Sequence, residues 1–224
     1  MNFGRVKIGG VNKGSNSGSG GAAFVEGAVF QGYEAESLSG ISVASAGDFD
    51  GDGVDDVLIG AYGSRHVYVL FGKDTYQIMR RRLEAKGSAL TGYDGFAMHG
   101  GNAGGFAGYD VGAAGDFNDD GVDDLLVGAF RSSAAARHGG ASFVVYGTAF
   151  DKTDGLLSAL PAKEPAGSHA TVFSASCRIT VVAAAGDYND DGYDDLLLGC
   201  PAAAKAFIVL GSDSFSSSMK LSEM

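Results

Sequence analysis

Short apolar stretches alternate with small polar turns along the chain, and this pattern predicts β-strands rather than helices. Runs such as Val57–Ile59 and Leu196–Leu198 are only a few residues long, and turns rich in Gly, Asp and Ser separate them. Because successive residues of these runs are apolar, both faces of the predicted sheets should be covered. No apolar run is long enough for a transmembrane helix, so we expect no direct membrane insertion by this chain.

The same pattern occurs three times. Segments that begin at Gly47, Gly115 and Gly186 superpose without gaps over fifteen residues, at spacings of 68 and 71 residues. Each repeat has a strand of small residues, an acidic turn, an apolar strand, and a later aromatic and β-branched strand that ends in Gly. A fourth strand is expected ahead of these three in each unit, near Phe30, Phe96 and Phe173.

Four short strands per unit favour small sheets packed face to face, as in a β-propeller. We therefore predict an all-β fold: a partial β-propeller of about three four-stranded blades, preceded by the remnant of another blade. The predicted ranges are 1–27 for the remnant, 28–76, 77–151 and 152–215 for the blades, and 216–224 for a tail. Exposed end blades would favour pairing with further blades of the same chain or self-association.

Composition narrows the class of protein. Glycine supplies 37 of the 224 residues, but only three prolines and no G-X-Y period exclude a collagen-like chain. With 16 basic and 27 acidic residues the formal net charge is −11, so we expect no nucleic-acid partner. The one basic cluster, Arg80 to Arg82, is interpreted as a solvated loop face in a stretch of some helical character that includes Ile78, Met79 and Leu83.

Fifteen of the acidic residues fall in three clusters, one in each repeat. Like charges so close together repel, and a bound cation is the usual explanation for them. Counted from the first Asp, positions one, three, five and nine of each loop carry side-chain oxygens, position six is a Gly suited to positive φ, and position seven offers its carbonyl. The candidate ligands are Asp48, Asp50, Asp52, Val54 and Asp56; Asp116, Asn118, Asp120, Val122 and Asp124; and Asp187, Asn189, Asp191, Tyr193 and Asp195.

Oxygen donors without His or Cys indicate a hard cation, and we predict about three Ca²⁺ ions. The first loop has four carboxylates where the others have three and an Asn, so it should bind calcium most tightly. The position-eight residues project away from the ion in this register and are expected to be solvated or to support the ligands. They are Asp55, Asp123 and Asp194.

Three alternatives compete with calcium sites. An EF-hand needs a bidentate Glu at position twelve and a following helix, but Ile59, Val127 and Leu198 stand there in β-like runs. A phosphotransferase Asp-x-Asp signature would not recur in three copies. An Asx-rich hairpin that binds nothing stays open for any single loop, because Asp, Asn and Gly favour turns, whereas three copies with the same donors favour a metal.

Other polar residues do not indicate catalysis. Cys177 and Cys200 are expected to be small core residues, because a hairpin centred on its acidic turn offsets them by roughly 16 Å, too far for a disulfide. The four histidines lack metal-site spacing and a nucleophile motif. We find no catalytic constellation and expect no enzyme activity.

The acidic loop with its following apolar strand resembles the FG-GAP repeat, the blade of integrin α-subunit propellers and of related secreted microbial proteins. The family's name corresponds loosely to Phe106-Ala-Gly108 with Gly128-Ala-Phe130, and to Gly199-Cys-Pro201. The resemblance implies a β-propeller with calcium in the hairpin loops of one face. It also implies an extracellular or cell-surface module for adhesion or for binding a protein or glycan ligand, without catalysis. The alternative is a non-catalytic propeller attached to a secreted hydrolase, as in the phospholipase D that acts on glycosylphosphatidylinositol anchors.

Overall fold

The computed structural model describes residues 30–32, 35–72, 81–83, 95–100, 105–131, 140–147, 170–215 and 218–221. These residues form β-strands in several sheets, and the only helices among them are two 3-10 turns, η1 (Ala35–Ser37) and η2 (Pro201–Ala203). The predicted all-β class is therefore confirmed. None of the helices in these ranges has the length and apolar character needed to cross a bilayer.

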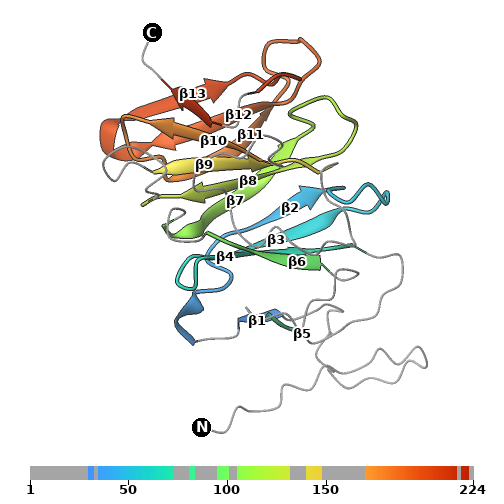
Figure 1. Ribbon diagram of the computed structural model, residues 1–224, viewed down its shortest axis with the longest axis vertical. Helices are drawn as coiled ribbons and strands as arrows, with labels where there is room; N and C mark the ends of the chain where they lie inside the picture. The colour runs from blue at the N-terminus through green and yellow to red at the C-terminus, as the bar shows by residue number, and fades with distance from the viewer. Residues whose placement is uncertain are drawn as a thin grey trace, which may run out of the picture.

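Three sheets carry the three repeats, and Figure 1 shows them stacked along the long axis of the molecule. The first sheet has the order β2 (Val43–Gly47), β3 (Asp56–Ala61), β4 (His66–Leu70) and β6 (Gly95–His99). The second has the order β7 (Ala107–Gly115), β8 (Asp124–Ala129), β9 (Ala141–Val145), β10 (Ala170–Ala175) and β14 (Ser218–Leu221). The third consists of β11 (Val181–Gly186), β12 (Asp195–Cys200) and β13 (Lys205–Val209), and a small sheet pairs β1 (Phe30–Gly32) with β5 (Arg81–Leu83).

The three strands predicted around each acidic turn are present in every repeat, but the predicted place of the fourth strand is wrong. β6 pairs antiparallel with β4, and β10 pairs antiparallel with β9. The strands near Phe96 and Phe173 thus complete the sheet of the preceding repeat, because the chain reverses beside the third strand before it crosses to the next sheet. The ranges and number of the blades stay predictions.

Two strands lie where none was expected. β5 falls in the stretch interpreted as having helical character, and β14 falls in the predicted tail. Both pair in parallel with a strand distant in sequence, β5 with β1 and β14 with β10. Such pairing depends on an available edge elsewhere in the fold, so the sequence of the strand itself gives little indication of it. The predicted end of a preceding blade near residues 14–25 lies outside the described residues.

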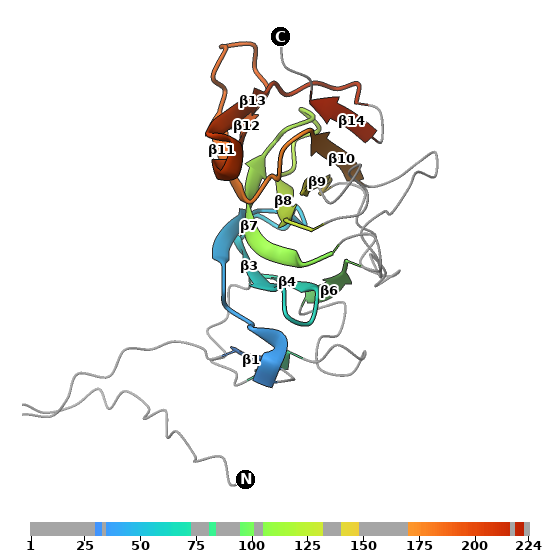
Figure 2. The same ribbon diagram turned by 90° about the vertical axis from the view of Figure 1, so that its left-hand side faces the viewer.

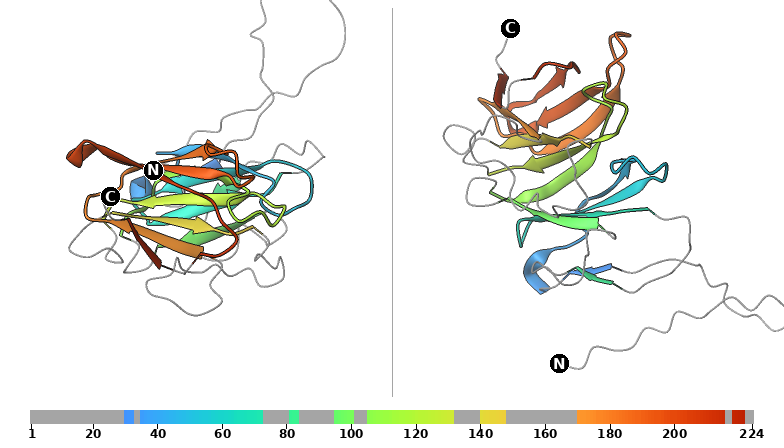
Figure 3. Two further views of the ribbon diagram at one scale, coloured as in Figure 1. Left: turned by 90° about the horizontal axis from the view of Figure 1, so that it is seen from above. Right: turned by 45° about the vertical axis from the view of Figure 1, so that its right-hand side comes forward.

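Apolar side chains fill the spaces between the sheets. Leu58 and Val69 of the first sheet share a cluster with Val127 of the second, and Leu126 of the second shares another with Leu196 of the third. Every residue of β8 is buried, so the predicted cover on both faces holds for the middle sheet. In the two outer sheets it does not, because Val57 is 43% exposed and Leu197 is 40% exposed. Figure 2 shows β7 between the first sheet and β11, and the view from above in Figure 3 shows the sheets lying over one another.

Cys177 and Cys200 form a disulfide, with Cα atoms 6.0 Å apart, so the expectation of unpaired core cysteines is wrong. That expectation assumed an extended hairpin. Instead, the segment between β10 and β11 turns back, and the Thr180 amide donates to the Gly199 carbonyl at 2.9 Å, which brings Cys177 beside the end of β12. The bridge ties the connection into the third sheet to the central strand of that sheet.

The two halves of the phenylalanine motif meet at the opposite ends of β7 and β8 from the acidic turn. The rings of Phe106 and Phe130 stack with centroids 4.8 Å apart, and Tyr62 from the first sheet packs against both. Phe106 has a positive φ of 61°, and Leu38, at the equivalent position of the first repeat, has a positive φ of 52°. The motif therefore marks a tight turn closed by an aromatic contact between neighbouring sheets.

Candidate metal centre

Each acidic turn connects the first two strands of a sheet, namely β2–β3, β7–β8 and β11–β12. All three lie along one edge of the stack, on the right in Figure 1. A β-bulge precedes each turn, and its glycine has positive φ: 61° at Gly47, 66° at Gly115 and 64° at Gly186. A bulge with a left-handed glycine bends the strand, and here it directs the following aspartate into the turn.

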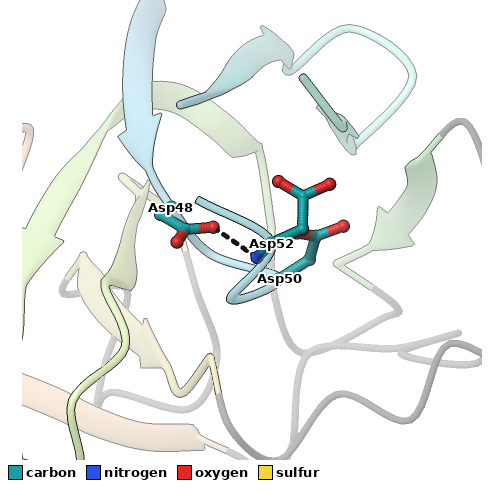
Figure 4. Close-up of side chains that lie close together, drawn as sticks. All are labelled: Asp48, Asp50 and Asp52. Atoms are coloured by element: carbon teal, nitrogen blue, oxygen red, sulfur yellow. Dashed lines mark hydrogen bonds between the residues drawn. The ribbon is translucent and has the colours of Figure 1, made fainter. Parts of the chain in front are cut away.

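The aspartates of the first loop accept hydrogen bonds from the amides of the same loop, and Figure 4 shows the bond from the Asp52 amide to Asp48. Asp48 accepts hydrogen bonds from the amides of Asp52 and Gly53, both at 2.9 Å. Asp50 accepts from the Asp52 amide at 3.1 Å, and Asp52 accepts from the Val54 amide at 3.0 Å. One oxygen from each of Asp48, Asp50 and Asp52 lies within 4.8 Å of the other two. The backbone thus gathers three predicted ligands around one point.

The second and third loops repeat this hydrogen-bond pattern. The first aspartate accepts from the amides at positions five and six: Asp116 from Asp120 and Gly121, both at 2.9 Å, and Asp187 from Asp191 at 3.0 Å and Gly192 at 2.9 Å. The position-three asparagines donate Nδ2 to the position-five carboxylate, at 2.8 Å from Asn118 and 2.7 Å from Asn189. The three loops are therefore equivalent in conformation as well as in sequence.

Glycine at position six has the positive φ that the spacing predicts. The values are 87° at Gly53, 90° at Gly121 and 97° at Gly192. Position four is left-handed as well, which the sequence reasoning missed: φ is 71° at Gly51, 56° at Asp119 and 59° at Asp190. Asp tolerates this conformation better than most residues, so its presence at position four was an available signal.

The position-nine carboxylates are buried and connect the turn to the end of the third strand. Their exposed fractions are 1% for Asp56 and 0% for Asp124 and Asp195. Each accepts a hydrogen bond from the glycine that follows the third strand: Gly72 at 2.7 Å, Gly147 at 2.9 Å and Gly211 at 2.8 Å. In the second and third loops the other oxygen accepts from the position-two amide, from Phe117 at 3.2 Å and Tyr188 at 2.8 Å. In the first loop, Oδ2 of Asp56 has no hydrogen-bond partner among the described residues.

Burial makes two of these carboxyl groups hard to ionise. It raises the pKa of Asp56 to about 6 and the pKa of Asp124 to about 8, and the other acidic side chains of each loop contribute in the same direction. The hydrogen bonds from Gly72 and Gly147 oppose this rise without cancelling it. A bound divalent cation would favour the charged form of these carboxylates. The close approach of acidic side chains, which is unfavourable in the loop alone, therefore suits a metal site.

The position-eight aspartates join neighbouring loops, a role that the sequence reasoning did not identify. Asp123 accepts a hydrogen bond from the Asp48 amide at 2.8 Å, and Asp194 accepts one from the Asp116 amide at 3.0 Å. We call this bond, from the first loop amide of one repeat to the position-eight carboxylate of the next, the latch. A Cβ on the bulge glycine of either preceding loop would collide with the latch carboxylate, so glycine is required there for space as well as for φ. The recurrence of Asp at position eight was the signal that could have revealed the latch.

The donor set of the first loop fits a calcium ion. Calcium takes six to eight oxygen ligands at about 2.3–2.6 Å, so oxygens within 4.8 Å of one another can share one ion. Asp56, the fourth predicted donor, has a buried oxygen without a hydrogen-bond partner among the described residues but is not part of this group of three, so its ligation stays a prediction. Carbonyl ligation by Val54, Val122 and Tyr193, and ligation in the second and third loops, stay predictions.

Stacked sheets, each with an acidic hairpin turn between its first two strands, define a β-propeller-like module. The family model described as the FG-GAP repeat matches residues 39–77, which include β2, β3, β4 and the first acidic loop. The chain therefore contains an FG-GAP repeat, as its resemblance to that family predicted. A search of the curated proteins found no match to this chain.

Proposed function

We propose that this chain is a calcium-binding, non-catalytic β-propeller-like module that works outside the cell in adhesion or in binding a protein or glycan ligand. One observation carries the calcium assignment: the first loop brings oxygens of Asp48, Asp50 and Asp52 within 4.8 Å of one another. Carboxylate oxygens at this spacing suit calcium better than a softer metal.

The ions would act mainly on structure. Three divalent cations would neutralise six charges and leave a formal net charge of −5 in place of −11. Neutralisation would relieve the repulsion within each loop and hold the three turns rigid along one edge of the stack. A rigid edge formed by several loops is a common way to present a binding surface for a macromolecular ligand.

Two observations support an extracellular or cell-surface location. FG-GAP repeats are typically extracellular, and one matches residues 39–77. The Cys177–Cys200 disulfide is the kind of bond that persists in oxidising compartments and is rare in the cytosol.

Calorimetric titration of the metal-free chain with calcium tests the proposal. We expect about three ions per chain, and each of the variants Asp48→Asn, Asp116→Asn and Asp187→Asn should remove about one. Asparagine keeps one of the two oxygen acceptors that the loop amides use, so these variants should still fold. Glu36→Gln is the matched control, because Glu36 is exposed and lies on η1, away from the acidic loops. Absence of calcium binding by the folded wild-type chain would refute the metal assignment.

The ligand-binding part of the proposal needs a separate measurement. The chain, immobilised on a surface, should retain a matrix protein or glycan in calcium and release it in EDTA. Retention that is unchanged in Asp48→Asn, or equal in calcium and EDTA, would show that the acidic loops do not organise the binding surface.

A further inference from the structure

Each of the two outer sheets has one exposed face. The equivalent residues of the other sheets are buried against a neighbouring sheet. We call the face toward the next repeat the forward face, marked by Leu58, Leu126 and Leu197 in the three sheets, and the opposite one the backward face, marked by Val57, Leu125 and Leu196. We propose that a second copy of the chain docks head to tail, with the forward face of the third sheet in one copy packed on the backward face of the first sheet in the other.

The forward faces of the first two sheets are fully covered by their neighbours. Phe49, Leu58 and Val69 in the first sheet and its turn, and Phe117, Leu126 and Val144 in the second, all have an exposed fraction of 0%. The corresponding residues of the third repeat are Tyr188, Leu197 and Ile208, with exposed fractions of 68%, 40% and 43%. Leu210 on the same face is 47% exposed. The third sheet thus has the apolar side chains of an inter-sheet contact without the contact.

The backward faces show the reverse arrangement. Val111 and Leu125 of the second sheet are 4% and 0% exposed, and Val182 and Leu196 of the third are 6% and 0% exposed. Their counterparts in the first sheet are Val43 and Val57, with exposed fractions of 64% and 43%. Phe30 of β1 packs against the outer part of this face, on the side of Tyr68 and Leu70, and leaves the inner part exposed.

Both halves of a further latch are also present at the two ends of the stack. Asp55, the position-eight residue of the first repeat, is exposed, whereas its counterparts Asp123 and Asp194 each accept an amide from the preceding loop. At the other end, a Cβ built on Gly186 meets nothing within 4 Å, although the same position in the two earlier repeats faces a latch carboxylate. The Asp187 amide, next to Gly186, is the equivalent donor. The one chain therefore supplies the donor and the acceptor of the missing latch.

Strand pairing points to the same partner. Within the described part of the chain the third sheet has three strands and ends at β13, whereas the first two sheets continue with β6 or β10. β1 and β10 have similar surroundings, because β1 pairs in parallel with β5 as β10 does with β14. β10 also pairs with β9, the third strand of its sheet, whereas β1 has no such strand beside it within the described part of the chain. β1 of one copy beside β13 of the other would give the third sheet a fourth strand.

These features favour a second copy over an unrelated partner, because each exposed element at one end has its complement at the other. Two copies would bring together six such sheets, within the four to eight of known closed propellers. Contacts of this head-to-tail kind form closed rings when the rotation between copies allows it.

Light scattering after size-exclusion chromatography tests the proposal on the full 224-residue chain over a range of micromolar concentrations. We expect a mass of twice 22.7 kDa at the higher concentrations. Ile208→Asp on the forward face and Val43→Asp on the backward face should each give a monomer. Arg131→Asp is the control for an aspartate at an exposed position after β8, in the middle sheet, and should leave the mass unchanged. Thermal melts in the monomeric concentration range verify that all variants fold.

Mixing distinguishes head-to-tail docking from other dimers. The Ile208→Asp chain retains its backward face and the Val43→Asp chain retains its forward face, so an equimolar mixture should form heterodimers although each variant alone is monomeric. Larger assemblies that both variants dissolve would also support the docking. A monomeric wild type, a dimer that neither variant breaks, or one that only a single variant breaks would overturn it. These results do not depend on calcium binding. The mass measurement tests the docking and the calcium titration tests the metal sites, so either proposal can fail without the other.

Discussion

Replacing Asp123 by alanine removes the acceptor of the first latch and leaves the Asp48 amide without its 2.8 Å partner from the second sheet. Asp123 is half-buried between the two loops. A hydrogen bond to a charged group contributes about 1.5–3 kcal/mol when it is buried, and partial exposure places this one near the lower end. We therefore expect Asp123→Ala to lower the free energy of unfolding by about 2 kcal/mol.

Asp123→Asn separates the bond from the charge. Asparagine retains a carbonyl oxygen in nearly the same place, so the amide of Asp48 keeps an acceptor and only the charge assistance is lost. The expected cost is about 1 kcal/mol, roughly half of that for alanine. The difference between the two variants is the part of the effect that belongs to the hydrogen bond itself.

Thermal and urea unfolding in EDTA measure both variants without a contribution from bound metal. In a chain of this size, about 2 kcal/mol corresponds to a fall in Tm of about 4–8 °C. Glu36→Ala is the matched control, because it changes the net charge equally at an exposed position away from the loops and should cost less than about 0.5 kcal/mol. In calcium, Asp123→Ala should also weaken binding at the first loop and leave the third loop unaffected.

The reasoning fails if Asp123→Ala unfolds like the Glu36 control. That result would mean that neighbouring loops are energetically independent and that the bond is a by-product of sheet packing. A fall in stability without any change at the first loop would place the effect in the packing of the sheets rather than in the loop.

Four further predictions follow from other features. Saturating calcium should raise the Tm by several degrees over EDTA, since a single site filled at a hundred times its Kd adds about 2.7 kcal/mol, and an unchanged melt would contradict structural metal sites. Calorimetry on variants with one intact loop should rank the first loop as the tightest, and a weaker first loop would refute the carboxylate argument. The double variant Cys177→Ser, Cys200→Ser should lose about 3 kcal/mol in urea unfolding, because the bridge spans 23 residues, and the reduced wild type should behave alike. Leu126→Ala, at a fully buried site between sheets, should lower the free energy of unfolding by about 3 kcal/mol. Leu197→Ala at the equivalent exposed position, measured on the monomer, should lower it clearly less, and equal losses would contradict the equivalence of the two faces.

The repeats could be predicted from the sequence because their signals are local. Each acidic turn joins two strands that are adjacent along the chain, so the spacing of Asp and Gly determines the turn and the apolar runs determine the strands. The positive φ of Gly53 and its counterparts follows from the same local pattern. The family resemblance, which the FG-GAP match at residues 39–77 confirms, rests on these segments too.

What escaped prediction depends on contacts between segments far apart in the sequence. Cys177 was placed by extending a hairpin in a straight line, and the observed turn before β11 depends on how the chain crosses from one sheet to the next. β14 exists because β10 offers an edge at that place. Asp123 looks like a solvated neighbour of its own loop until the packing of two sheets brings it to Asp48.

The latch has a direction, and this direction affects how repeats can be added to a chain of this kind by duplication. Each repeat offers a carboxylate backward and an amide with its glycine forward, so a duplicated gene segment carries both halves of the connection. A new unit inserted at any point would find its counterparts already in place on either side. A single substitution at either half, by contrast, would weaken a junction and not only the unit that carries it.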